Sequence, residues 1–464
     1  MEIQVDYGSF SLVRELNGYL AHQSNLATII CAPATPQILE DFHSTNALDG
    51  TIIVSIWELG EIIGPMMIGP LSELYGRLYV YNTANIFFTI FSIASALSTS
   101  INMLIGFRFL SGIAVASTTL NAGTVVDMFP QSERGTAMSI MGFSPLVGVI
   151  CGPILGGYVS ANLSWRWAFW LVAIIAGSLE VGFLLFFRET YAFTILERKA
   201  KRLRRETGNP NIRSKYDEGK SAKDLFKRAI VRPVKMLIFS PIVMMLTLYN
   251  SLVYGYLYLV ITTLSSVFQD VYHFKQGPVG LTYIGIGIGM TLAVIVCRMT
   301  LDKLVKRQAA KLAQPEETNN HSANQPAFID PEYRLPPMLL GGTLLPLGLF
   351  LYGWTSQYHL HWIAPIIGTA LLGFGLMVTL IPTSTYLMDV YTVYAASAAA
   401  ANLCIKNIFG TVLPLAGPPL YKKLGLGWGN SLLGFVALAF VPIPLILMKF
   451  GKRLRNSEKR RLVL

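Results

Sequence analysis

The sequence predicts an all-α integral membrane protein in which twelve transmembrane helices form two six-helix bundles. Hydrophobic residues make up 53% of the 464 residues, charged residues make up 14%, and the mean hydropathy is +0.49. A soluble protein carries roughly a quarter charged residues, so this composition does not supply a water-facing surface. The apolar residues also fall into long runs that are separated by clusters of charge.

Eleven apolar runs are close to the length of about 20 residues that a helix needs to cross the bilayer core. They cover residues 50–71, 79–98, 102–126, 136–160, 165–187, 236–265, 278–299, 336–355, 362–387, 395–417 and 429–448. An earlier run, 18–39, is weaker because His22, Gln23 and Asn25 interrupt it. We therefore predict a first helix that is weak or truncated.

Positive charge indicates the side of the membrane on which each loop lies, because Lys and Arg are retained in the cytoplasm. With both termini in the cytoplasm, 31 of the 37 Lys and Arg residues fall in cytoplasmic segments. A long basic stretch separates six spans from six. The predicted organisation is an N-terminal bundle (1–187), a basic cytoplasmic linker (188–235), a C-terminal bundle (236–448) and a basic cytoplasmic tail (449–464).

Composition and motifs exclude several classes of protein. Membrane orientation explains the net charge of +11, so nucleic acid is not an expected partner. The sequence has no glycine-rich phosphate loop that ends in Gly-Lys-Ser or Gly-Lys-Thr, so ATP is not the expected energy source. The four cysteines lie in apolar segments without metal-ligand spacing. We expect no enzyme activity, no cofactor and no metal site.

Six spans on each side of a basic loop are typical of an alternating-access transporter, whose two bundles rock about a site near mid-membrane. An ionisable residue at that depth costs roughly 3 kcal/mol or more and is a candidate for function. Glu58 and Glu61 are three residues apart and share one face of the second span. Because burial disfavours a charged carboxyl group, such a residue can carry a proton. A static hydrogen-bonded pair is the alternative interpretation.

Four further ionisable residues lie in or at the end of predicted spans. Arg108 in the fourth span is the expected counter-charge for the two glutamates, and a buried structural ion pair is the alternative. Glu180 in the sixth span and Lys406 in the eleventh span are secondary candidates. Asp389 lies at the cytoplasmic end of the tenth span, where we expect a gate or a helix-end partner.

The stretch GPLSELYGR, which begins at Gly69, resembles the loop signature of the major facilitator superfamily. Glu73 stands where that family more often has aspartate. Gly69 permits close helix approach and Gly76 permits a tight turn. Arg77 is expected to pair with an acid at a neighbouring helix end, and Asp127 is the candidate.

The fifth span contains GFSPLVGVICGPILGG, which resembles the motif shared by the drug:proton antiporters of that superfamily. Its glycines recur at a spacing that makes a closely packing helix face, and its internal proline can bend the helix. A face of this kind suits the gate between two bundles, and ordinary tight packing is the alternative. The residues concerned are Gly148, Gly152, Pro153, Gly156 and Gly157.

Other stretches resemble the fungal branch of this antiporter group, and the likeness covers nearly everything after about residue 26. They include SIWELGEIIGP, RFLSG, SWRWAFW, LYNSLVYGYLYL, YLMDVY and SAAAANLCIKNIFGTVLPL. The resemblance places Arg108 in the proton-coupling machinery and implies that the first, fourth, seventh and tenth spans line a central cavity. The candidates for the substrate cavity are Tyr249, Asn250, Tyr254, Thr383, Ser384, Tyr386 and Lys406, the last at a position where the group more often has arginine.

Aromatic faces with a few polar groups suit amphipathic or cationic organic molecules. We expect proton-coupled efflux of small amphipathic organic compounds, such as drugs, toxins or secondary metabolites, by alternating access. Two alternatives stay open, namely a proton symporter or facilitator that imports a nutrient or polyamine, and a non-transporting sensor on the same fold. The expected partners are the substrate, protons and the lipid bilayer. We expect a monomer in the plasma membrane, with the vacuolar membrane as the alternative.

Overall fold

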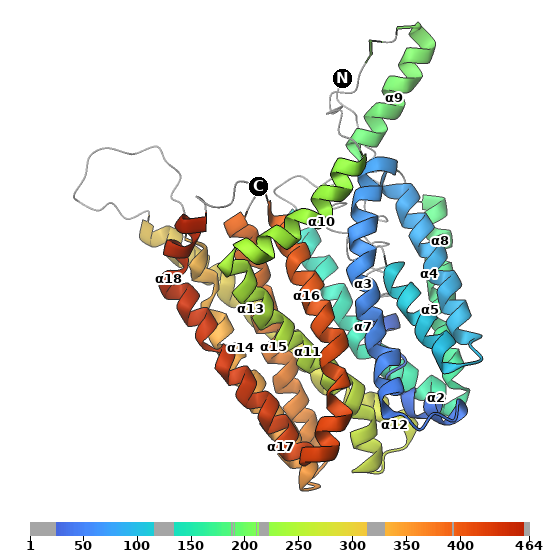
Figure 1. The fold of residues 1–464 in the computed structure, drawn as a ribbon, viewed down its shortest axis with the longest axis vertical. Coiled ribbons are helices and arrows are strands. Elements are labelled where there is room, and N and C mark those ends of the chain that lie inside the picture. The colour runs from blue at the N-terminus through green and yellow to red at the C-terminus, as the bar shows by residue number, and fades with distance from the viewer. Residues whose placement is uncertain are drawn as a thin grey trace, which may run out of the picture. The chain divides into compact units, whose positions relative to one another are not determined.

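The computed structural model describes residues 25–115, 134–186, 189, 191–209, 211–212, 222–312, 330–391 and 394–458. Every regular element in these ranges is a helix (Figure 1). The predicted all-α class is therefore confirmed.

The helices follow one another along the chain with short connections. The earlier ones are α2 (Thr35–Asp41), α3 (Ala47–Tyr75), α4 (Arg77–Ala96), α5 (Ile101–Ile113), α7 (Arg134–Asn162), α8 (Trp165–Phe186), α9 (Ala192–Thr207) and α10 (Ala222–Phe239). The later ones are α11 (Pro241–Asp270), α12 (Gln276–Thr282), α13 (Ile284–Leu312), the 3-10 helix η1 (Pro331–Arg334), α14 (Pro336–Gln357), α15 (Ile363–Tyr391), α16 (Ala395–Leu415), α17 (Gly417–Phe440) and α18 (Pro442–Glu458).

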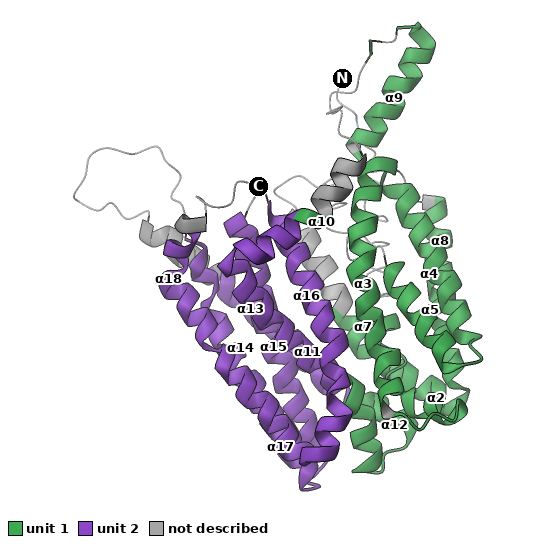
Figure 2. Ribbon diagram, in the orientation of Figure 1, with its two compact units in different colours: residues 1–231, 261–282 green, residues 232–260, 283–464 purple. Residues whose placement is uncertain are grey.

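The chain forms two compact units, which are coloured separately in Figure 2. Unit 1 consists of Met1–Val231 and Ile261–Thr282, and unit 2 consists of Arg232–Val260 and Tyr283–Leu464. Helix α11 therefore contributes its first part to unit 2 and its last part to unit 1. In unit 1, α4 packs against α5 and α8, whereas in unit 2 α14 packs against α15 and α17 (Figure 1).

Eight helical stretches of the described chain are long and apolar enough to cross a membrane, and Ile101–Ile113 and Leu146–Asn162 are shorter apolar helices. Helices α3 and α14 cover the predicted second and ninth spans in full. The predicted eighth span is divided into α12 and α13. The predicted fourth span begins as α5, and its part beyond Val115 lies outside the described residues.

The predicted first span is helical over 25–29 and turns over 30–34, before α2 begins at Thr35. Pro33 lies in this turn and has no backbone N–H to continue a helix. Pro36 stands in the first turn of α2, where its fixed backbone angle is compatible with helix. The first span is thus two short helical pieces joined by a turn.

Glycines allow α3 and α5 to approach backbone to backbone inside unit 1. A Cβ atom on Gly112 would overlap the carbonyl oxygen of Trp57, and one on Gly60 would overlap that of Phe109. Alanine-sized residues at these two positions would force the helices apart. The close approach places the middle of α3 beside Arg108 of α5.

Candidate functional site

Arg108 is held inside unit 1 by backbone carbonyl groups, and only 2% of the residue is exposed. Its Nη1 and Nη2 donate hydrogen bonds of 2.7 Å each to the carbonyl oxygens of Ala27 and Thr28. Its Nε donates to the carbonyl oxygen of Ile53 at 3.0 Å. A guanidinium group offers donors in a fixed planar fork, so one side chain joins the first span, α3 and α5.

Aromatic rings cover the same guanidinium group and lead from it to a carboxylate. The Arg108 Cζ lies 4.8 Å from the centre of the Trp57 ring and 6.0 Å from that of Phe169. Trp57 Nε1 donates a 2.8 Å hydrogen bond to Oε1 of Glu61, one turn further along α3. A continuous line of contacts therefore runs from Arg108 through Trp57 to Glu61.

The structure gives the two glutamates of α3 different surroundings. Glu58 is 1% exposed, whereas Glu61 is half-buried and bound to Trp57. The sequence led us to expect Arg108 as their counter-charge. In the part of the chain that the structure describes, however, no carboxylate lies within ion-pair distance of Arg108, and carbonyl oxygens are its acceptors. Backbone acceptors leave no mark in a search by residue type, and the role of Trp57 was also missed.

Glu180 lies apart from this cluster. It is 5% exposed on α8 and contacts the side chain of Asn85 on α4. It follows Phe169 on the same helix by eleven residues, which corresponds to roughly 16 Å along the helix axis at ~1.5 Å per residue. The structure thus provides two separate buried acidic positions in unit 1, one on α3 and one on α8.

The antiporter-type motif on α7 makes close backbone contacts with two neighbours in unit 1. On one side, a Cβ on Gly152 would lie 3.1 Å from the carbonyl oxygen of Leu26, and one on Gly156 would overlap that of Ile30. On the other side, a Cβ on Gly157 would lie 3.0 Å from the Gly277 carbonyl oxygen in α12.

Two further members of the motif lie at the same packing face. The carbonyl oxygen of Pro153 leaves no room for a Cβ on Gly280 of α12, and Gly148 is buried. The motif therefore sits between α12 and the helical start of the first span. The same short segment of that span supplies the carbonyl groups that bind Arg108.

The loop signature is completed by an acid that the sequence analysis did not single out. Gly76 has a φ of +96° and connects α3 to α4. Glu189 accepts hydrogen bonds from the backbone N–H groups of Arg77 at 2.9 Å and of Tyr191 at 3.1 Å. Glu189 therefore caps the start of α4, where an acidic group is favoured.

The other members of the loop signature are placed as follows. The Arg77 side chain donates from Nη1 to Oγ of Ser72 at 2.5 Å, and its Cζ lies 5.0 Å from the Tyr191 ring centre. Glu73 is exposed, and Gly69 is half-buried. The expected partner Asp127 lies outside the described residues.

In unit 2, α11 and α16 present facing polar side chains one turn apart on each helix. Asn250 Nδ2 donates to Oδ1 of Asn402 at 3.3 Å. Four residues further along each helix, the Lys406 Nζ lies 4.1 Å from the ring centre of Tyr254. The Tyr254 and Tyr258 rings are 4.9 Å apart. Asn250, Tyr254 and Lys406 thus form one group.

The remaining candidates for the substrate cavity point elsewhere in unit 2. Tyr249 is 1% exposed and stacks on Phe440 of α17 with ring centres 6.3 Å apart. Thr383 Oγ1 contacts Sδ of Met338 at 3.5 Å. Ser384 is half-buried and donates to the carbonyl oxygen of Leu380 at 2.9 Å, and Tyr386 is fully buried.

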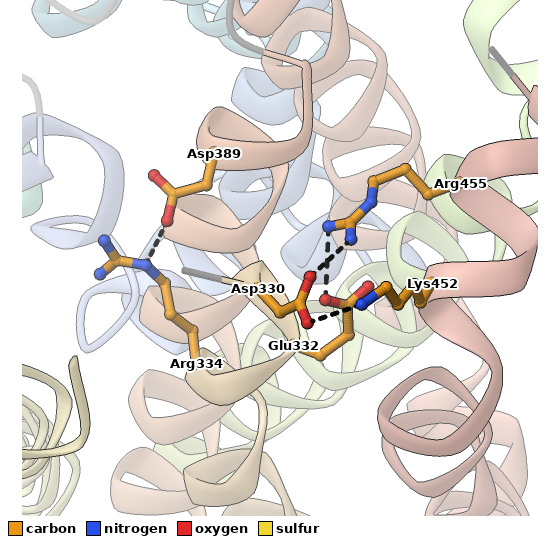
Figure 3. A network of polar contacts seen from close by, with 6 residues as sticks. All are labelled: Asp330, Glu332, Arg334, Asp389, Lys452 and Arg455. Atoms are coloured by element: carbon orange, nitrogen blue, oxygen red, sulfur yellow. Dashed lines mark hydrogen bonds and ion pairs between the residues drawn. The ribbon is translucent and has the colours of Figure 1, made fainter. Parts of the chain in front are cut away.

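A network of charged side chains joins three elements at one end of unit 2 (Figure 3). Asp389 at the end of α15 forms an ion pair with Arg334 of η1. Arg455 of α18 forms ion pairs with Asp330 at 3.0 Å and Glu332 at 3.3 Å. Asp389 is therefore a partner of a helix end in this structure, which is one of the two roles expected for it.

Arg455 should contribute more to stability than its neighbour Lys452, although both bind Asp330. The Arg455 side chain is 8% exposed and that of Lys452 is 70% exposed. Replacing Arg455 by methionine leaves the largely buried Glu332 without its cation, which costs roughly 3 kcal/mol, whereas an exposed pair contributes about 1 kcal/mol or less. We expect R455M to lower the thermal unfolding midpoint in nanodiscs clearly more than K452M. Equal midpoints for the two variants would contradict this ranking.

Among the described residues, no group of three or more His, Cys, Asp or Glu side chains is arranged to hold a metal ion. The chain is 47% identical over 435 residues to the MFS-type transporter penM of Penicillium rubens, a match that spans 94% of this chain and 83% of that protein. It is 46% identical over 435 residues to the efflux pump radE of Floropilus chiversii, across 94% and 79% of the two chains. Among solved structures, the partially occluded inward-open xylose transporter XylE from E. coli superposes with a TM-score of 0.66 at 15% identity, covering 96% of this chain and 98% of that one.

These similarities and the apolar helices together identify a multi-pass membrane transport protein. The family model of the Major Facilitator Superfamily matches residues 23–414, and the chain belongs to that superfamily. Its fold is the twelve-helix fold of the family.

Proposed function

We propose that this transporter exports small amphipathic organic compounds from the cytoplasm in exchange for protons, by alternating access. The printed name of the relative from Floropilus chiversii, an efflux pump, supports the direction. The antiporter-type glycine motif, which packs against the segment that binds Arg108, supports the exchange mode. The organisation that goes with this proposal is two bundles, 1–187 and 236–448, joined by the linker 188–235 and followed by the tail 449–464.

The observation that carries the proposal is the line of contacts from Arg108 through Trp57 to Glu61. A carboxyl group at this depth exchanges a proton at low cost only if its charged form is stabilised in one state and not in another. The Trp57 N–H stabilises the charged form of Glu61 in this structure. A rearrangement of α3 or α5 that removes this donor would favour the protonated form. We assign the proton-coupling role to Glu58, Glu61 and Arg108, with Glu180 as a second proton position.

Coupling also requires that the proton and the substrate prefer different conformational states or compete for one site. We assign substrate contact to Asn250, Tyr254 and Lys406, because these side chains lie together on α11 and α16. Tyr249, Thr383, Ser384 and Tyr386 belong to the packing that supports this group. We further propose a monomer that is located in the plasma membrane.

Replacing Glu61 by glutamine should abolish efflux that is driven by a proton gradient and leave the protein folded. Glutamine keeps the size of the side chain and an oxygen that can accept the Trp57 hydrogen bond, but it cannot bind and release a proton. The measurement is efflux of a fluorescent substrate from proteoliposomes with and without an imposed pH gradient. We expect E61Q to lose at least 90% of the gradient-dependent rate.

The matched control is E40Q, because Glu40 is an exposed glutamate on α2. This variant should retain the parent rate. If the parent protein shows equal efflux with and without the gradient, proton coupling is refuted. If E61Q retains the full gradient-dependent rate, Glu61 is not the coupling residue.

A further inference from the structure

The apolar parts of the spans in unit 2 contain a single charged residue. Residues 241–260, 284–297, 336–357, 363–388, 395–415 and 424–448 include Lys406 and no Asp, Glu, Arg or other Lys. Its ammonium group lies 4.1 Å from the centre of the Tyr254 ring and is half-buried. Among the described residues, no carboxylate lies within ion-pair distance of it. The positive charge is therefore not neutralised by the part of the protein around it.

The Tyr254 ring does not compensate for the burial of this charge. A lysine near the centre of a membrane helix costs roughly 3 kcal/mol. A cation–π contact returns about 0.5–1 kcal/mol at an exposed site and about 2 kcal/mol when the pair is dry. A deficit remains, and an anion placed against the ammonium group would remove it. Charged residues that persist in a membrane without a partner are expected to serve a ligand.

Unused polar groups lie close to Lys406 on the same two helices. Asn407 is fully buried, and neither its Oδ1 nor its Nδ2 has a hydrogen-bond partner in the described structure. Asn250 is also fully buried and uses its Nδ2 for Asn402, while its Oδ1 is unpaired. Buried amide groups without partners are costly, so they indicate a position that a ligand or water completes. The amide N–H of Asn407 can donate to an anionic oxygen.

We propose that the substrate is an organic acid, with a carboxylate or an acidic enol or phenol bound by Lys406 and its flat apolar part lying on Tyr254. The sequence alone led us to expect amphipathic or cationic molecules. A cation placed about 5 Å from the ammonium group would instead be repelled by roughly 3 kcal/mol at an effective dielectric constant of about 20. The inference rests on the proposed export function only for the statement that the bound molecule is transported.

The test is equilibrium binding to the full chain in nanodiscs without any gradient, followed by fluorescence polarisation. Fluorescein and rhodamine 123 share a xanthene ring system but carry opposite charges at neutral pH. Naphthaleneacetic acid and its primary amide form a second pair of equal size, used as competitors for fluorescein. We expect fluorescein to bind at least tenfold more tightly than rhodamine 123, and the acid to displace it at least tenfold better than the amide.

Three variants separate the role of the charge from a structural role. K406Q should weaken fluorescein binding at least tenfold, whereas K406R, which keeps the charge, should bind within about threefold of the parent. K423Q removes an exposed lysine of the same unit and should bind as the parent does. The thermal midpoint of each variant is measured alongside, so that an unfolded K406Q is recognised; the charge is then judged from K406R and the acid and amide pair.

Several results would overturn the inference. These are no fluorescein binding by the parent, equal or tighter binding of rhodamine 123, equal competition by acid and amide, or unchanged binding in a folded K406Q. Flux is measured separately in proteoliposomes. Acid binding without gradient-dependent flux would refute the export function and keep this inference. Gradient-dependent efflux of rhodamine 123 but not of fluorescein would keep the export function and refute the inference.

Discussion

Replacing Gly156 by alanine is expected to reduce transport at least tenfold. A Cβ at this position overlaps the backbone carbonyl oxygen of Ile30, so α7 and the first span must move apart to accommodate it. Overpacking of this kind typically costs about 1–3 kcal/mol. The displaced segment also carries the Ala27 and Thr28 carbonyl groups that bind Arg108. One methyl group should therefore disturb both the packing motif and the buried arginine, which is measured as the initial efflux rate from proteoliposomes.

Gly177 on α8 provides the control for this substitution. The nearest atom to a Cβ on Gly177 is a methyl carbon of Thr89 at 3.9 Å, which is an ordinary contact distance. G177A should therefore transport at the parent rate and unfold at or slightly above the parent midpoint, because alanine favours helix over glycine. Equal rates for G156A and G177A would show that the close contact of α7 with the first span is not needed for transport.

Replacing Arg108 by methionine should abolish transport and lower the thermal midpoint. Methionine keeps an unbranched apolar stem but leaves three carbonyl oxygens, those of Ala27, Thr28 and Ile53, without their donor. Each carbonyl group left unsatisfied costs about 1–3 kcal/mol, and release of the lysine- or arginine-type burial penalty offsets part of this sum. We expect at least a hundredfold loss of gradient-driven efflux together with a measurable decrease in the midpoint.

Lysine at position 108 tests whether charge alone is sufficient. An ammonium group is a compact charge on a flexible stem and cannot reproduce the planar fork that reaches three acceptors. R108K should therefore recover less than about one tenth of the parent rate. The control is R202K, since Arg202 is an exposed residue of α9 whose side chain is 80% exposed. If R108K transports at the parent rate, the carbonyl contacts do not determine function.

The membrane fold could be predicted from the sequence because each apolar run is long and is bounded by charge. This signal placed α3 and α14 correctly, and the resemblance to the loop signature and the antiporter motif indicated the family. The first span was harder, because Pro33 divides it into pieces that are each too short to register as a span. The break between α12 and α13 was missed for a similar reason, since the residues on both sides of it are apolar.

The candidate site could be predicted only in part. Buried ionisable residues such as Arg108 and Glu61 stand out in an apolar sequence, but their actual acceptors and donors do not. Arg108 binds backbone carbonyl groups that every residue type possesses, and Glu189 caps α4 from 112 residues away along the chain. Tyr249 and Tyr254 have similar sequence surroundings, yet one packs on Phe440 and the other faces Lys406. Such differences depend on helix rotation, which tertiary packing decides.

The lone ammonium group of Lys406 has a consequence for the energetics of the transport cycle. If a monovalent anion leaves the cell for each proton that enters, two positive charges move inward per cycle, so the exchange is electrogenic. A potential that is negative inside drives such a step with about 2.3 kcal/mol per charge per 100 mV. Exchange of a monovalent cation for a proton would gain nothing from the same voltage. The replacement of an acid by a base as cargo would therefore disconnect this carrier from half of the electrochemical force across its membrane.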